Sequence, residues 1–159
     1  MFREITRKAQ ILDTEAVENI LNTETWGVLS LIGDGDYPYG VPVNYAYCDG
    51  KIYFHGAMKG REFGAVANQD KVSFTVVSED RIVEKEYTTA YSSVILFGRV
   101  ACLEGEERRE ALIKMTDRLA PHVDHKINVE TVDKCRSAAV FAITIEHMGG
   151  KVGSLNRTK

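Results

Sequence analysis

The most chemically suggestive stretch of the sequence runs from Tyr53 to Glu62 and reads Tyr-Phe-His-Gly-Ala-Met-Lys-Gly-Arg-Glu. An apolar segment ends there in His55, and two glycines and two cations, Lys59 and Arg61, lead into a predicted helix. Glycines let a backbone approach a ligand closely, and a helix N-terminus presents free N–H groups and partial positive charge. The pattern suits a phosphate monoester. It is equally typical of a strand-to-helix turn with solvated cations, so both interpretations stay open.

Two further segments place polar groups beside extended structure. In Val41–Tyr45, Pro42 predicts an edge strand or a bulge that frees backbone groups, and Asn44 offers both a donor and an acceptor. In the segment 91–100, the hydroxyls of Ser92 and Ser93 precede a long apolar run. Such a run fits a domain core, or a subunit interface that also lines a pocket, and the sequence leaves this choice open.

Other candidates for chemistry are weaker. The glycine-rich run 33–40 lacks the spacing and the following helix of a dinucleotide-binding motif, and therefore reads as a turn. His122 and His125 flank an aspartate, but zinc motifs need a second ligand pair that the sequence does not supply, so we expect no metal site. The chain has three widely spaced cysteines, Cys48, Cys102 and Cys135. Their odd number argues against a disulfide framework and for a reducing, cytoplasmic location.

Composition restricts the class of protein. The 159 residues, 44% hydrophobic and 27% charged, predict one globular domain over residues 1–159. A net charge of −3 argues against nucleic acid as a partner. No apolar run approaches the roughly 20 residues that span a bilayer, and the N-terminus lacks the apolar stretch of a signal peptide, so we expect no membrane partner.

Hydrophobic patterning predicts a mainly β protein with peripheral helices. A first helix begins at Asp13 or Thr14, and further helices are expected at 60–68, 106–119 and 129–136. Strands are expected at 27–32, 39–47, 51–55, 72–77, 92–103 and 138–146, with a more polar one at 82–87 nearer an edge. About six strands joined mainly by hairpins should pair antiparallel and curl into a barrel.

These segments together resemble a known family, the flavin-binding split-barrel proteins that include pyridoxamine 5'-phosphate oxidase. The most similar subgroup is the Nim-type 5-nitroimidazole resistance proteins. The resemblance covers essentially the whole chain, and the pieces occur in the family's order. The matching pieces are Tyr39–Tyr45, Ile52–Ala57 with Gly60-Arg61, Tyr91–Val94 with Phe97–Arg99, and Ile145-Glu146 with Gly150-Lys151.

The resemblance implies a six-stranded antiparallel split barrel and a homodimer with two FMN molecules at the subunit interface. It implies three groups of cofactor-binding residues. Along the isoalloxazine run Val43, Asn44 and Tyr45. Around the ribityl phosphate lie His55, Gly56, Ala57, Lys59, Gly60 and Arg61. Lining the flavin, commonly from the partner subunit, are Ser92 and Ser93, and the Gly-Lys that contains Lys151 recurs in the Nim-type group.

One position departs from the family pattern. The family often has Lys where this chain has Glu62, and a carboxylate is unfavourable beside a phosphate. The C-terminal arginine segment with which pyridoxamine phosphate oxidases hold their substrate is not evident, which makes oxidation of vitamin B6 the weaker interpretation.

The resulting hypothesis is an FMN-dependent oxidoreductase that reduces a small planar acceptor, such as a nitroaromatic. His55 would contact the phosphate or donate a proton, with a purely structural histidine as the alternative. Three other hypotheses remain: a non-catalytic flavin carrier or sensor, a barrel that has lost its cofactor, and a haem-binding split barrel. The candidate axial ligands for haem are His55, His122, His125 and His147.

Overall fold

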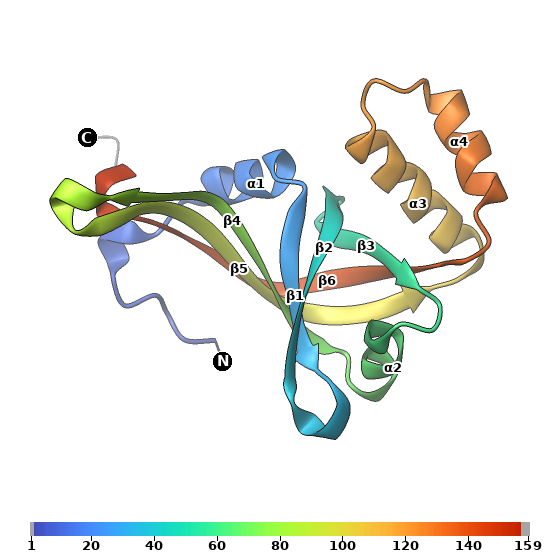
Figure 1. Cartoon of the computed structure of the whole chain (residues 1–159), viewed down its shortest axis with the longest axis horizontal. Helices are drawn as coiled ribbons and strands as arrows, with labels where there is room; N and C mark the ends of the chain where they lie inside the picture. The colour runs from blue at the N-terminus through green and yellow to red at the C-terminus, as the bar shows by residue number, and fades with distance from the viewer. Residues whose placement is uncertain (1, 157–159) are drawn as a thin grey trace.

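The structure, a computed structural model, describes residues 2–156, and all of their side chains except those of Glu62, Phe63 and Asn156. Its centre is a closed antiparallel barrel with the strand order β1-β2-β3-β6-β5-β4 (Figure 1). This confirms the mainly β, six-stranded barrel expected from the sequence. The strands are β1 (Trp26–Ile32), β2 (Pro38–Cys48), β3 (Lys51–Ala57), β4 (Lys71–Val83), β5 (Thr88–Leu103) and β6 (Ala138–Val152).

Helices cover the barrel on three sides. The α-helices are α1 (Thr14–Thr23), α2 (Arg61–Asn68), α3 (Gly105–Leu119) and α4 (His125–Lys134), and short 3-10 turns lie at Lys8–Gln10, Asp34–Asp36, Glu84–Glu86 and Ser154–Asn156. In Figure 1, α3 and α4 lie together at one end of the molecule, and α2 sits below the barrel. None of the described helices has the length and apolar character needed to cross a membrane.

The barrel core forms because alternate strand residues point inward. Leu29, Phe74 and Leu96 are fully buried, whereas their neighbours along each strand face outward. Two ring pairs fill the centre: Phe54 stacks on Phe141 at 5.0 Å, and Tyr45 meets Phe74 edge-on at 5.2 Å. A second buried cluster joins α3 to the outer side of β2, β3 and β6, so this helix is held by apolar packing as well.

Two strands and part of a third run well past the barrel. The hairpin of β4 and β5 projects beyond it, with the end of β6 alongside, as the left side of Figure 1 shows. The prediction of a separate strand at 82–87 is therefore wrong. Val72–Val77 and Ile82 belong to one continuous strand, β4, with a register shift between Val77 and Glu79. Polar residues are tolerated here because the hairpin is exposed, and the chain reverses at Tyr87, which has a φ of 47°.

The last helix begins earlier than its apolar pattern indicates. It starts at His125 rather than Val129, and the Asp124 side chain caps it by accepting a hydrogen bond of 2.8 Å from the N–H of Lys126. The first turn carries few apolar residues, which is why periodicity alone placed the start one turn late. By contrast, Asp13 caps α1 as the sequence indicates.

A glycine in β5 allows its close approach to β6. A Cβ added at Gly98 would overlap the backbone oxygen of Thr144 and lie 2.9 Å from Cγ2 of Ile143. Backbone cannot yield without breaking the ladder, so we expect Gly98→Ala to lower the free energy of unfolding by about 2–3 kcal/mol. Gly40→Ala is the matched control, since its Cβ meets only Val28 at 3.5 Å. Equal urea midpoints for the two variants would contradict this explanation.

A carboxylate in the hairpin of α3 and α4 makes stability depend on pH. The pKa of Asp117 lies below its usual value, mainly because its carboxylate accepts a hydrogen bond from the Asn128 amide and to a smaller extent because it contacts the His125 ring, each at 2.8 Å. A pKa lowered by folding stabilises the native state at neutral pH, and this stabilisation is lost as pH falls below about 4. We therefore expect Asp117→Asn to lower the urea midpoint at pH 7, with a difference that shrinks at pH 3. A difference that stays constant with pH would contradict this cause.

Candidate functional site

The turn between β3 and α2 presents backbone donors and positive charge together. Gly60 is the N-cap of α2 and has no side-chain cap, so the first turn of this eight-residue helix keeps free N–H groups. Lys59 and Arg61 on either side are exposed, and neither forms an ion pair with a side chain that the structure describes. The side chain of Glu62, where the sequence departs from the family, lies outside the described residues. The turn has the donors and charge that a phosphate requires.

The end of β3 lies directly before this turn. His55, Gly56 and Ala57 pair with Val140, Ala139 and Ala138 of β6. His55 is exposed, in contrast to Tyr53 and Phe54 before it, which are buried. The structure therefore brings six of the expected site residues into one continuous surface segment, namely His55, Gly56, Ala57, Lys59, Gly60 and Arg61.

In β2 the three expected residues face in different directions. Asn44 is exposed, and its Nδ2 donates to the carbonyl of Thr25 at 3.0 Å. Among the residues that the structure describes, none donates to its Oδ1, which can accept. Val43 packs against the barrel core. Pro42 lies in the part of β2 that pairs with β1 but not with β3, so it occupies the open edge that the sequence indicates.

The side chain of Tyr45 does not support a role in binding a cofactor. It is 1% exposed, and its hydroxyl donates to the carbonyl of Leu21 at 3.0 Å. Burial, with a smaller contribution from Glu24, raises its pKa far above the ordinary value. This ring belongs to the core because positions alternate along a strand: Asn44 faces outward, so Tyr45 faces inward.

The remaining expected residues lie on the far part of β5 and β6. Ser93 is paired with Lys151 and Ser92 with Val152. Ser93 and Lys151 line a pocket of about 150 Å³ together with Ile95, Phe97 and His147. Packing alone explains the glycine at position 150, since a Cβ at Gly150 would lie 2.7 Å from Val17 of α1.

The two groups of polar residues lie far apart in one chain. His55 pairs with Val140 of β6, and Ser93 pairs with Lys151, eleven residues further along the same strand. At about 3.3 Å per residue this is roughly 35 Å of strand. A single small ligand cannot contact both groups in one subunit.

Apolar side chains cover the outward face of the sheet between these groups. Ile95 and Phe97 of β5 are 44% and 37% exposed, and Trp26 and Val77 on β1 and β4 are 48% and 39% exposed. The registers place these residues on one continuous surface, with Thr75 between Val28 and Ile95. An exposed apolar patch of this kind is typical of a surface that binds another molecule.

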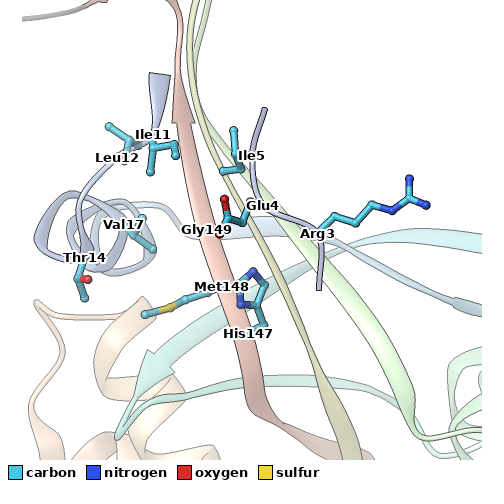
Figure 2. A pocket seen from close by; sticks show the side chains of 10 residues that line it. All are labelled: Arg3, Glu4, Ile5, Ile11, Leu12, Thr14, Val17, His147, Met148 and Gly149. Carbon is cyan, nitrogen blue, oxygen red and sulfur yellow. The ribbon is translucent and has the colours of Figure 1, made fainter. Parts of the chain in front are cut away.

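The N-terminal segment lines part of this region, which the sequence did not indicate. It forms a pocket of about 270 Å³ with the start of α1 and with β6, and Figure 2 shows Ile5 and Glu4 beside Gly149 and His147. Residues 2–5 have no strand or helix periodicity. The only signal for His147 is its outward place in the alternation of β6, and that signal does not distinguish a site from a surface.

The other two histidines that the sequence singled out have separate surroundings. His125 contacts Asp117 at 2.8 Å at the start of α4, and His122 lies exposed in the preceding loop. Among the described residues, no group of three or more histidine, cysteine, aspartate or glutamate side chains is placed to hold a metal ion.

Comparison with known proteins identifies the family. The sequence profile of the family described as Pyridoxamine 5'-phosphate oxidase matches residues 13–152, which is most of the chain. The chain belongs to this family. The family match spans all six strands and the turn at Gly60. No curated protein sequence matches the chain.

Solved structures share the family's fold with this chain. A proposed 5-nitroimidazole antibiotic resistance protein from Bacteroides thetaiotaomicron superposes with a TM-score of 0.74 at 21% identity, over 89% of this chain and 86% of that one. The flavocytochrome Anf3 from Azotobacter vinelandii gives 0.75 at 24% identity, over 98% and 73%. An FAD- and haem-binding protein from Mycobacterium smegmatis gives 0.71 at 19% identity, over 89% and 72%. At these identities the likeness extends to the fold alone; by their descriptions, the second of these proteins is a flavocytochrome and the third binds FAD and haem.

Proposed function

We propose that the protein is a homodimeric, FMN-dependent oxidoreductase that reduces a small planar acceptor, such as a nitroaromatic compound. The observation that carries the proposal is the separation of the polar groups. Residues suited to a phosphate lie at the turn after β3, and residues suited to a polar ring lie roughly 35 Å of strand away. Two subunits that pack through the apolar face can bring one group from each chain to the same ligand.

The residues present fit a bound FMN at its phosphate end. The uncapped helix N-terminus at Gly60 supplies backbone N–H groups, and Lys59 and Arg61 supply two exposed cations. The backbone at Gly56, without a side chain, lets the cofactor approach β3 closely. Asn44 contributes an amide oxygen on the outer face of β2.

The residues of the second group fit the ring end. We assign Ser92, Ser93 and Lys151 to the ring of an FMN whose phosphate is held by the partner subunit. A cation near the ring favours its reduced, anionic form, and a hydroxyl can donate to a ring nitrogen or carbonyl. Bound FMN would supply the electron transfer itself, between a donor such as a reduced nicotinamide and the acceptor.

The chain's own contribution to proton transfer is assigned to His55. Its ring is exposed on the strand that ends at the phosphate turn, and an imidazole nitrogen can donate or accept a proton. From this place it can bind the phosphate or give a proton to the reduced acceptor. The free thiols of Cys48, Cys102 and Cys135 agree with a cytoplasmic location, which we include in the proposal.

The visible absorption spectrum of the freshly purified protein tests the cofactor. We expect a two-banded flavin spectrum, FMN released on denaturation, and bleaching of the bands by a reduced nicotinamide followed by recovery on addition of a nitroaromatic acceptor. A Soret band would favour a haem-binding barrel instead. Flavin without turnover with any donor and acceptor would favour a carrier or sensor, and a colourless protein that ignores added FMN would refute the proposal.

A further inference from the structure

Three rings meet at the surface beside the proposed flavin ring site. Phe97 of β5 and His147 of β6 are cross-strand partners, and their ring centroids lie 6.3 Å apart. We call these two side chains the aromatic platform. Phe2 lies over both: its ring is 4.8 Å from His147 at an interplanar angle of 7°, and 5.1 Å from Phe97 at 23°. The platform therefore accepts a flat ring in a nearly parallel, stacked position.

The segment that carries this ring is weakly held. None of the backbone hydrogen bonds described for the chain involves residues 2–5, which we call the strap; the first anchored residue is Thr6, whose carbonyl accepts from Lys8. Phe2 is itself 44% exposed. Ile5 contacts the surface at Gly149, where no side chain intervenes. Because side-chain contacts alone hold the strap, it can leave the platform without disrupting any strand.

Positive charge lies on both sides of the platform. Lys151 lines the pocket that also contains Phe97 and His147, and Lys71 lines a second pocket of about 420 Å³ together with Phe2 and Phe97. The carboxylate of this second pocket, Glu146, is paired with Arg99 at 2.8 Å, so its charge is compensated. Arg3 of the strap lines the first of these pockets, and in Figure 2 its guanidinium extends away from the neighbouring pocket. Among the ion pairs described, none involves Lys71 or Lys151. A ligand for this place carries an aromatic ring and a negative group.

We propose that the aromatic platform of Phe97 and His147 is a binding site for a planar aromatic anion, and that the strap closes this site by placing Phe2 where the ligand ring stacks. The identification of this ligand as the electron acceptor rests on the proposed function. The binding site and the competing strap rest only on the stacked rings and the surrounding cations. Ligand and strap are alternatives, so removing the Phe2 ring strengthens ligand binding.

Calorimetric titration of the full chain with 4-nitrobenzoate tests the site. The Phe2→Ala variant loses the ring that competes with the ligand, and a stacked aromatic pair is worth about 0.5–1.5 kcal/mol. We therefore expect this variant to bind 4-nitrobenzoate roughly three- to tenfold more tightly than the unchanged protein. Phe2→Tyr, which keeps the ring, should bind as the unchanged protein does. Tyr87→Ala is the matched control, because Tyr87 is an exposed aromatic residue at the turn between β4 and β5 and lines none of the pockets that contain Phe97.

Variants of the platform complete the test. His147→Ala should weaken binding about tenfold, and His147→Phe, which keeps a ring, should restore most of it. Cyclohexanecarboxylate, an anion with a saturated ring, should bind far more weakly than 4-nitrobenzoate. Unchanged or weaker binding by Phe2→Ala would overturn the proposal, and so would full binding by His147→Ala.

The same titration in the presence of FMN separates the two proposals. Simultaneous binding of FMN and 4-nitrobenzoate supports a site for the acceptor beside the flavin. Displacement of 4-nitrobenzoate by FMN would overturn the acceptor site, because the platform would then belong to the flavin ring. If FMN does not bind but Phe2→Ala still tightens binding of 4-nitrobenzoate, the proposed function fails while the platform and strap stand.

Discussion

The double variant Lys59→Ala/Arg61→Ala should bind FMN about 100-fold more weakly than the unchanged protein. Each cation flanks the uncapped N-terminus of α2, where it can form a charge-assisted hydrogen bond to a phosphate. Such bonds contribute about 1.5–3 kcal/mol each, and the backbone donors that remain would retain part of the affinity. Quenching of FMN fluorescence on titration measures the change.

Two comparisons make this result specific to the phosphate. Lys126→Ala removes an exposed cation from α4, distant from the turn, and should leave the affinity unchanged. Riboflavin, which lacks the phosphate, should bind the double variant and the unchanged protein alike. A double variant that still binds FMN normally would show that the phosphate is held elsewhere. Lys59 and Arg61 would then be solvated cations at an ordinary strand-to-helix turn, which is the alternative interpretation of this segment.

The substitution Ile95→Asp should separate the subunits and abolish FMN binding together. Ile95 lies at the middle of the apolar outer face, 44% exposed, with Thr75 and Gly149 as its cross-strand neighbours. An aspartate there would bring its carboxylate into a face that the dimer buries. The desolvation of a carboxylate costs several kcal/mol, which a salt bridge to Arg3 or Lys151 of the same pocket offsets only in part. We expect a monomer by analytical ultracentrifugation and a loss of FMN affinity of at least about 100-fold.

The matched control is Ile127→Asp, which places the same charge at an exposed isoleucine on α4. It should alter neither the oligomeric state nor the affinity. The two consequences of Ile95→Asp must appear together, because the proposal takes the phosphate group and the ring group from different subunits. A monomer that retains normal FMN binding would refute the shared site, even if the dimer itself is real.

Local pattern determined which parts of the fold could be predicted. Alternation in β5 identifies Val94 and Leu96 as core residues, and the caps of α1 follow from residue type at Asp13. The hairpin of β4 and β5 could not be predicted, because its polar outer half lacks a buried face and so lacks alternation. What determines its structure is pairing between strands, which single-strand patterns do not contain.

The sequence indicated which residues belong to the candidate site, but not which of their side chains face outward from the barrel. Glycines and cations around Gly60 indicate the turn after β3, and the structure places them there together. Whether Asn44 or Tyr45 faces outward depends on the register of β2, which a motif does not reveal. The stacking of Phe2 on His147 joins residues from opposite ends of the chain, and no spacing in the sequence encodes it.

The position of β6 between β3 and β5 has a consequence for how the chain folds. Residues 51–57 must find residues 138–144, so barrel closure depends on contacts distant in sequence, and such folds form in milliseconds to seconds rather than microseconds. During synthesis the other five strands emerge before β6. Until it arrives, β3 and β5 each have an unpaired edge, and a nascent chain is most vulnerable to aggregation in that interval.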